Sequence, residues 1–83
     1  MDDFKFPVLD NKKTGERIKA VRIQNGYSVR ELQEVLGFTT PQAIYKWQWG
    51  ESIPDVQNLL AIAKLFHVTI DSLLVTEEEG GQR

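Results

Sequence analysis

The sequence predicts an all-α fold, a compact bundle of about five short helices. Apolar residues recur at helical spacing in five successive segments, and a capping residue, a glycine or a proline bounds each segment. No segment shows the alternation of apolar and polar residues that is typical of a β-strand. The 83 residues suffice for one small core and are too few for two domains.

The first residues of the chain are not predicted to be helical. Residues 1–13 lack a sustained helical period, and Pro7 favours extended backbone. Four apolar residues of this segment are candidate anchors on the domain: Phe4, Phe6, Val8 and Leu9. We therefore divide the chain into an extended lead-in (residues 1–13), a helical domain (14–75) and a flexible acidic tail (76–83).

The first helix is predicted from about Thr14 to Asn25. Ile18 and Val21 lie three residues apart on its apolar side, and basic residues occupy most of the other positions. Asn25 followed by Gly26 is a stop signal.

The second helix has a strong start signal. Ser28 can accept a hydrogen bond from the backbone of the next turn, and Glu31 is placed to bond back, which is the spacing of a capping box. The residues predicted to face the core are Leu32, Val35 and Leu36. Gly37 ends this helix because glycine readily adopts positive φ.

The third helix is predicted to begin near a proline. Pro41 suits the first turn because its missing N–H would be unpaired there. Thr40 is a candidate cap, and Thr39 with Gln42 would form an alternative capping box. The helix is predicted to stop at Gly50.

Two further helices complete the domain. Asp55 is predicted to cap the fourth, and His67 to lie just past its end. The apolar residues at helical spacing in this helix are Val56, Leu59, Leu60, Ala63 and Phe66. Thr69 begins a last short helix with Ile70, Leu73 and Leu74.

Positive charge is concentrated in the first half of the chain. Residues 11–50 carry seven lysines and arginines against three glutamates, a net charge of +4, although the whole chain has −2. Residues 51–79 carry one lysine against six acidic residues, a net −5. This clustering is compatible with a solvated surface alone. It also allows a polyanion to bind, because local charge sets the field at a contact surface.

The composition argues against several classes of site and location. The chain has no cysteine, which excludes disulfides and thiolate metal sites, and no cofactor motif is present. No apolar run approaches the roughly 18 residues of a membrane span, and the first ten residues contain acids where a secretory signal has basic residues. We expect a cytoplasmic protein with no metal, no cofactor and no membrane partner.

The third helix has two chemically distinct sides. At about 100° per residue, Ile44 and Trp47 point to one side, flanked by Ala43 and Gln48. The other side carries Gln42, Tyr45, Lys46 and Trp49. One of the two tryptophans is therefore predicted in the core and the other on the surface.

The outward side of this helix suits a DNA groove. Glutamine can pair with adenine through two hydrogen bonds, lysine can reach guanine or phosphate, and tyrosine can donate to phosphate or contact a thymine methyl group. On these residues alone, packing of Tyr45 and Trp49 against a partner protein is an equal alternative. However, a capped helix, a glycine turn and a second helix with a polar outward side form the helix-turn-helix arrangement, whose second helix enters the major groove.

Several short motifs occur together and in order along residues 15–74. They are "IKAVR" in the first helix, S-x-x-E-L at the start of the second, L-G at the turn, I-x-x-W in the third helix, G-x-x-x-P after it, and "LLAIAKLF" leading to "VTIDSLL". With this ordered set the chain resembles phage-repressor-like, XRE-type helix-turn-helix proteins. The resemblance implies a bundle of about five helices that binds operator DNA as a symmetric homodimer and regulates transcription, with repression the first expectation.

The resemblance also implies which residues contact double-stranded DNA. The family's base-reading positions fall on Pro41, Gln42, Ala43 and Lys46. Because the side chain of Pro41 cannot hydrogen-bond, Gln42 and Lys46 should carry most of the direct readout. The residues expected to contact the DNA backbone or the groove walls are Thr40, Tyr45, Trp49, Arg30, Arg22, Arg17, Lys12, Lys13 and Ser52.

Three departures from the family pattern bear on these roles. The turn "GFTTPQ" is one residue longer than usual before the third helix. Val29 follows Ser28 where the family has a phosphate-binding glutamine, so Arg30 or the backbone amides at the helix start would make that contact. Arg22 faces Gln48 where the family pairs arginine with glutamate, which would leave Arg22 freer to meet a phosphate.

Two other classes of function compete with DNA binding: an enzyme and a protein-binding module. An enzyme is not expected, since His67 is the lone histidine and neither paired carboxylates nor a phosphate-binding glycine loop is present. A protein-binding module, such as an antitoxin or adaptor, is the stronger alternative because aromatic residues are enriched at interfaces. The residues that would dock such a partner are Tyr45, Trp49, Phe4, Phe6, Leu74 and Val75.

Overall fold

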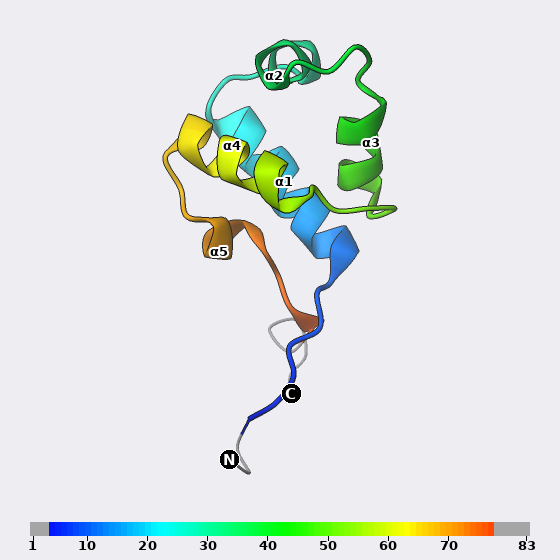
Figure 1. Cartoon of the computed structure of the whole chain (residues 1–83), viewed down its shortest axis with the longest axis vertical. Helices are drawn as coiled ribbons and strands as arrows, with labels where there is room; N and C mark the ends of the chain where they lie inside the picture. Colours follow the sequence, from blue (N-terminus) through cyan, green and yellow to red (C-terminus); the bar gives the residue numbers. More distant parts are fainter. Residues whose placement is uncertain (1–3, 78–83) are drawn as a thin grey trace.

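Residues 4–77 fold into a bundle of five helices, as predicted (Figure 1). The computed structural model describes residues 4–77. Its helices are α1 (Asn11–Gln24), α2 (Val29–Leu36), α3 (Gln42–Trp49), α4 (Val56–Phe66) and α5 (Ile70–Leu73). Residues 4–77 contain no β-strand, only an isolated antiparallel bridge between Leu9 and Thr76. None of the helices in this range is both long and apolar enough to cross a membrane.

Helix α1 begins three residues before the predicted start at Thr14. The carboxylate of Asp10 accepts a hydrogen bond from the backbone N–H of Lys13 at 2.9 Å, which caps the helix at Asn11. The sequence-based start was late because the residues of this first turn, Asn11 to Lys13, are all polar and give no apolar period.

The predicted anchoring role of the lead-in is wrong for its aromatic residues. Phe4 and Phe6 are 70% and 80% exposed, and Val8 is also exposed. The segment does not fold back onto the helices. Instead it pairs with the chain after α5, where the Glu77 N–H donates to the carbonyl of Val8 at 2.8 Å, and it projects from one end of the bundle (Figure 1).

The same pairing takes up the first residues of the predicted tail. Thr76 bridges Leu9, which is half-buried, and the Asp10 N–H donates to the carbonyl of Val75 at 2.8 Å. The buried hydroxyl of Thr14 reinforces this contact, because it accepts from the Val75 N–H at 3.0 Å and donates to the Val75 carbonyl at 3.3 Å. The rest of the predicted tail, residues 78–83, lies outside the described residues.

The ends of α2 and α3 follow the sequence signals closely. Gly37 and Gly50 terminate the two helices in the left-handed conformation. Pro41 is the N-cap residue of α3 rather than a residue of its first turn, and the predicted capping box of Thr39 with Gln42 does not form. The hydroxyl of Thr40 accepts only a long hydrogen bond, 3.4 Å, from the Gln42 N–H. The fourth helix starts and stops as predicted, at the caps Asp55 and His67. Thr69 caps the last helix, which ends at Leu73 and leaves the predicted Leu74 outside it.

One apolar cluster holds the five helices together. Its buried members are Ile18, Leu32, Ile44, Trp47, Leu59, Ile62, Ala63, Phe66 and Leu73. Three residues predicted to face the core are exposed instead: Val35, Val56 and Leu60. Taking Leu59 as 0°, Ile62 lies near −60°, Ala63 near 40° and Leu60 near 100°, so the buried arc of α4 includes Ile62 and excludes Leu60.

Helices α1 and α3 approach so closely that their backbones touch. A Cβ atom added to Gly15 of α1 would lie 1.8 Å from the carbonyl oxygen of Trp47 in α3. At the end of α3, a Cβ on Gly50 would lie 2.8 Å from the Cα of Lys12. The first turns of α1 therefore fix where the second half of α3 can lie.

Candidate nucleic-acid interface

The two sides of α3 differ in burial as the helical spacing predicted. Ile44 is fully buried and Trp47 is 4% exposed, so both belong to the core. The residues of the outward side are all exposed: Gln42, Tyr45, Lys46 and Trp49. Since the exposed fraction of Trp49 is 58%, the two tryptophans separate into one core residue and one surface residue, as predicted.

The aromatic residues of α3 make different contacts on its two sides. Trp47 meets Phe38 of the turn edge to face, with ring centroids 5.8 Å apart and an interplanar angle of 69°. On the outer side, Tyr45 and Trp49 stack on each other at 5.8 Å and 22°. The stacked pair forms a flat aromatic surface beside Lys46, and Tyr45 remains 38% exposed.

An open cleft of about 530 Å³ runs along one side of the start of α3. Five of the predicted DNA-contacting residues line it: Thr40, Gln42, Ala43, Lys46 and Ser52. The turn residues Gly37, Phe38 and Thr39 complete the lining. The cleft thus gathers amide, ammonium and hydroxyl groups from the turn, from α3 and from the loop after it, a mixture suited to base edges and phosphates.

A second groove, of about 330 Å³, lies between α2 and α3. Pro41 and Tyr45 line it on the α3 side. The α2 side is formed by Val29, Arg30, Gln33 and Glu34. The exposed outer edge of α3 is therefore flanked by surface from both the turn and the preceding helix.

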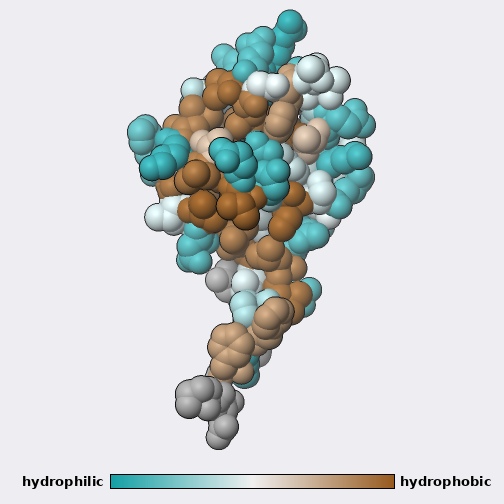
Figure 2. All heavy atoms as spheres, in the orientation of Figure 1, coloured by the Kyte–Doolittle hydropathy of each residue, from teal (hydrophilic) through white to brown (hydrophobic). Residues whose placement is uncertain are grey.

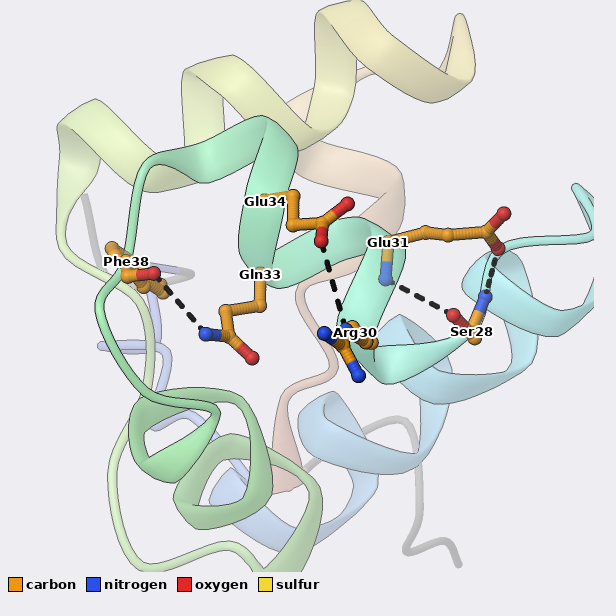
Figure 3. Close-up of polar contacts among 6 residues, drawn as sticks. All are labelled: Ser28, Arg30, Glu31, Gln33, Glu34 and Phe38. Carbon is orange, nitrogen blue, oxygen red and sulfur yellow. Dashed lines mark hydrogen bonds and ion pairs between the residues drawn. The ribbon is translucent and has the colours of Figure 1, made fainter.

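Arg30 is available on this surface. Its Nε lies 3.6 Å from a carboxylate oxygen of Glu34, one turn along α2, and both side chains are largely exposed (Figure 3). An exposed pair of this kind contributes little free energy, typically below about 1 kcal/mol, so Arg30 can exchange it for a phosphate.

The start of α2 is already occupied by its own capping box. The Glu31 N–H donates to the Ser28 hydroxyl at 3.0 Å, and the Ser28 N–H donates to the Glu31 carboxylate at 2.8 Å (Figure 3). This places a negative side chain where the alternative phosphate contact, through the α2 amides, was expected. Of the two candidates for that contact, Arg30 is the better placed.

Arg22 does not have the freedom predicted for it. Its residue is only 8% exposed, and its Nη1 donates to the backbone carbonyl of Tyr27 at 2.6 Å. Its Nε donates to Oε1 of Gln48 at 3.3 Å. The predicted freedom of Arg22 is therefore wrong, because its guanidinium joins α1, the loop before α2, and α3.

The remaining basic residues of α1 point in different directions. Arg17 is exposed, but its Nη1 donates to the carbonyl of Ser72, so its guanidinium is held at α5 rather than beside α3. Lys12 lies against Gly50 at the end of α3, and its ammonium forms an exposed 3.8 Å pair with Glu16. Lys13 is exposed at the start of α1. Lys12 is the basic residue of α1 that this geometry places beside the end of α3.

The domain matches a known family over most of its helical part. Residues 18–73 match the family described as Helix-turn-helix. The chain belongs to the helix-turn-helix family. Its α2 and α3 are the two helices of the family's name, and the residues between them form the turn.

Individual helix-turn-helix proteins show the same relationship. The chain is 36% identical over 63 residues to the HTH-type transcriptional activator BcrR of Enterococcus faecalis, covering 76% of this chain and 30% of that protein. It is 35% identical over 60 residues to the SPbeta prophage-derived uncharacterized HTH-type transcriptional regulator YonR of Bacillus subtilis (strain 168), covering 72% and 55%. The chain thus spans about a third and about half of the lengths of these two relatives.

A solved structure of a repressor bound to operator DNA is also similar. The P22 c2 repressor protein in complex with synthetic operator 9T aligns with a TM-score of 0.66 and 34% identity, covering 74% of this chain and 91% of that one. This repressor structure contains operator DNA, which directs attention to the exposed side of α3 in the present chain.

Sequence reasoning placed Arg30 of α2 on this surface but missed Gln33. Gln33 lines the groove beside Tyr45, and its Nε2 donates to the carbonyl of Phe38 at 3.3 Å, which braces the turn (Figure 3). Applying the 100° spacing to α2 would have revealed this, since Arg30, Gln33 and Glu34 lie between about 100° and 200° from the buried Leu32.

The replacement Gln48→Glu is expected to raise the free energy of unfolding of this helix-turn-helix domain by about 1 kcal/mol. Within residues 4–77, no carboxylate lies within 4.0 Å of the Arg22 guanidinium, and its partner Gln48 is neutral. A carboxylate at the same position would convert the 3.3 Å hydrogen bond into a charge-assisted one. Urea unfolding at neutral pH measures the change.

The matched control is Gln24→Glu, which adds the same charge at an exposed position of α1 and should change stability by less than about 0.5 kcal/mol. The gain at Gln48 should also disappear in acid, where the introduced carboxylate is protonated. Equal changes in the free energy of unfolding for the two replacements would show that a charge at position 48 does not strengthen the contact with the Arg22 guanidinium.

Proposed function

We propose that this chain binds double-stranded DNA in a sequence-dependent manner and regulates transcription. The observation that carries the proposal is the exposed side of α3, where Gln42 and Lys46 share one open cleft with Thr40 and Ser52. The relatives named as transcriptional regulators and the repressor solved with operator DNA support it.

In this proposal α3 enters the major groove. Gln42 and Lys46 read base edges, because a glutamine amide can pair bidentately with adenine and a lysine ammonium can reach the acceptors of guanine. Ala43 and Pro41 offer apolar contact to neighbouring bases. The remaining contacts to phosphates, sugars or groove walls come from Thr40, Ser52, Arg30, Lys12, Lys13, Tyr45 and Trp49.

The basic half of the chain would provide the sequence-independent part of the affinity. Residues 11–50 carry a net charge of +4, so the protein can bind a polyanion although its total charge is −2. We further propose a homodimer on DNA, which would bind half-sites about one helical turn apart. Repression is the proposed outcome because occupancy of an operator is sufficient for it, and the site of action is the cytoplasm, where the operator would lie.

A salt titration tests the proposal directly. The chain is titrated against a labelled random duplex at low salt and again at several higher salt concentrations, with fluorescence polarisation as the readout. DNA binding through lysines and arginines predicts that the affinity falls steeply as salt rises, because counterions are released from the duplex. Absence of binding at about 50 mM salt would contradict the proposal, since the electrostatic contribution is strong at that concentration.

Gln42→Ala is expected to weaken binding to a selected operator by about 1 to 3 kcal/mol and to relax the preference at one base pair. The matched control is Gln57→Ala, which removes an exposed glutamine from α4 and should leave binding unchanged. Selection from random duplexes followed by titration of single-base variants measures both properties. Equal weakening on every sequence would mean that Gln42 positions the helix and does not read a base.

A protein-binding module is the second candidate function. The stacked pair of Tyr45 and Trp49 favours it, because the two aromatic rings form a flat and exposed surface of the kind enriched at protein interfaces. Replacing both residues with alanine separates the two functions. Loss of DNA affinity would assign the pair to the groove, and unchanged DNA affinity would leave it free for a protein partner.

A further inference from the structure

The projecting lead-in forms an apolar arm, which we define as residues 4–9. Phe4, Phe6 and Val8 occupy alternate positions of a segment that leaves the bundle as an extended trace in Figure 1. All three are exposed, the two phenylalanines to 70% and 80%. Figure 2 shows apolar surface along this narrow end of the molecule.

The arm is held in place at its base. Its last residue, Leu9, bridges Thr76, and the carbonyl of Val8 accepts from the Glu77 N–H at 2.8 Å. These contacts fix the direction in which the arm leaves the bundle. In Figure 1 that direction is away from the helices, so the arm does not cover an apolar surface of its own domain.

A matching apolar surface lies on α4. Val56 and Leu60, one helical turn apart, are exposed although both are apolar. Leu60 leads into a groove of about 320 Å³ at the junction of α4 and α5. The other residues lining this groove are Ala63, Lys64, His67, Val68, Thr69 and Ile70. Figure 2 shows apolar surface over α4 and α5 on the same view.

We propose that two copies of this chain exchange arms, each arm lying with Phe4 and Phe6 along α4 and in the α4–α5 groove of the other copy. Every copy carries both the arm and the groove, so a two-fold symmetric dimer satisfies both pairs at once. The arrangement adds an interaction surface to the homodimer proposed on DNA. It does not depend on DNA binding, and it is tested without DNA.

The area of the contact favours exchange over direct pairing of the two arms. A buried aromatic side chain removes roughly 150 to 250 Å² from water. Near the lower end of this range, the two phenylalanines of one arm together contribute about 350 Å². Two arms and the two groove surfaces that receive them would then remove about 1,400 Å² from water. This lies within the range of about 1,200 to 2,000 Å² for stable interfaces. Two arms packed only on each other would bury about 700 Å², the size of a weak crystal contact.

The exchange leaves the proposed DNA surface uncovered. None of the residues lining the α4–α5 groove lines either of the two clefts beside α3. Both copies could therefore present α3 to DNA while their arms are exchanged.

The test is sedimentation equilibrium of the full chain without DNA, on three variants. Phe6→Ser changes the arm, Leu60→Lys changes the groove, and Val35→Ser removes an exposed apolar side chain of α2 that belongs to neither. Because all three side chains are exposed, the variants should keep the helical content of the parent at low temperature, which circular dichroism checks. The parent should dimerise, and the arm and groove variants should each weaken the dimer about tenfold or more, as loss of a central apolar contact does. The Val35 variant should dimerise with the same affinity as the parent.

A mixing experiment gives the sharper result. An equimolar mixture of the Phe6 and Leu60 variants contains one intact arm and one matching intact groove, so the mixed dimer should be tighter than either variant alone. Three results would overturn the proposal: a parent that stays monomeric at about 0.5 mM, where mass action favours even weak dimers, weakening by only one of the two variants, or no recovery on mixing. Weakening by the Phe6 variant alone would indicate that the arms pair with each other.

Discussion

Trp47→Ala is expected to lower the free energy of unfolding by about 3 to 5 kcal/mol. Trp47 is 4% exposed, packs against Phe38 and is the largest side chain in the apolar cluster. Its removal leaves a cavity between α3 and the rest of the bundle. A small domain has a total stability of only about 5 to 15 kcal/mol, so the variant should be partly unfolded at physiological temperature.

The matched control for this replacement is two residues away. Trp49 is 58% exposed, and Trp49→Ala should change stability by less than about 0.5 kcal/mol. Urea unfolding followed by circular dichroism measures both variants without relying on tryptophan fluorescence. A loss at Trp49 as large as the loss at Trp47 would contradict the assignment of the two sides of α3.

Gly15→Ala is expected to destabilise the domain by about 3 kcal/mol, the upper end of the usual range for overpacking. The new Cβ would lie 1.8 Å from the Trp47 carbonyl oxygen and 3.2 Å from the Cα of Gln48. Both are backbone atoms of α3, which cannot rotate out of the way as a side chain can. The two helices must separate, and α3 must shift relative to the rest of the bundle.

Whether Gly15→Ala stabilises or destabilises the domain distinguishes a steric clash with α3 from the ordinary helix propensity of alanine. In an exposed helix interior, alanine is more favourable than glycine by about 1 kcal/mol. Ala20→Gly, at an exposed position of the same helix, measures that preference and should lower stability by about this amount. Chemical denaturation of both variants gives the comparison. A stabilising Gly15→Ala would mean that α1 and α3 are not in backbone contact.

Several helix ends could be predicted because local chemistry determines them. Ser28 with Glu31, Gly37 and Asp55 each act within one turn of their own position, and all three signals were read correctly. The two sides of α3 could be predicted for a similar reason, since the 100° spacing alone separates Trp47 from Trp49.

Other features depend on contacts between distant parts of the chain. The spacing shows which residues of a helix share a side, but the width of the buried arc depends on its neighbours, so Val56 and Leu60 were placed wrongly. The sequence predicts a free Arg22, because it does not reveal the burial of this residue, which follows from the close crossing of α1 and α3. The direction of the arm follows from the pairing of Leu9 with Thr76.

The attachment of α3 to α1 and the proposed contact of α3 with DNA use different sides of the helix. The atoms that hold α3 against α1 are its inward side chains and backbone atoms, including the carbonyl of Trp47 that faces Gly15. The side chains proposed to meet DNA lie on the other side and contribute little to this attachment. Substitutions at Gln42 and Lys46 can therefore accumulate during evolution, and operator preference can diverge among descendants of one ancestor, while the orientation of the helix is inherited unchanged.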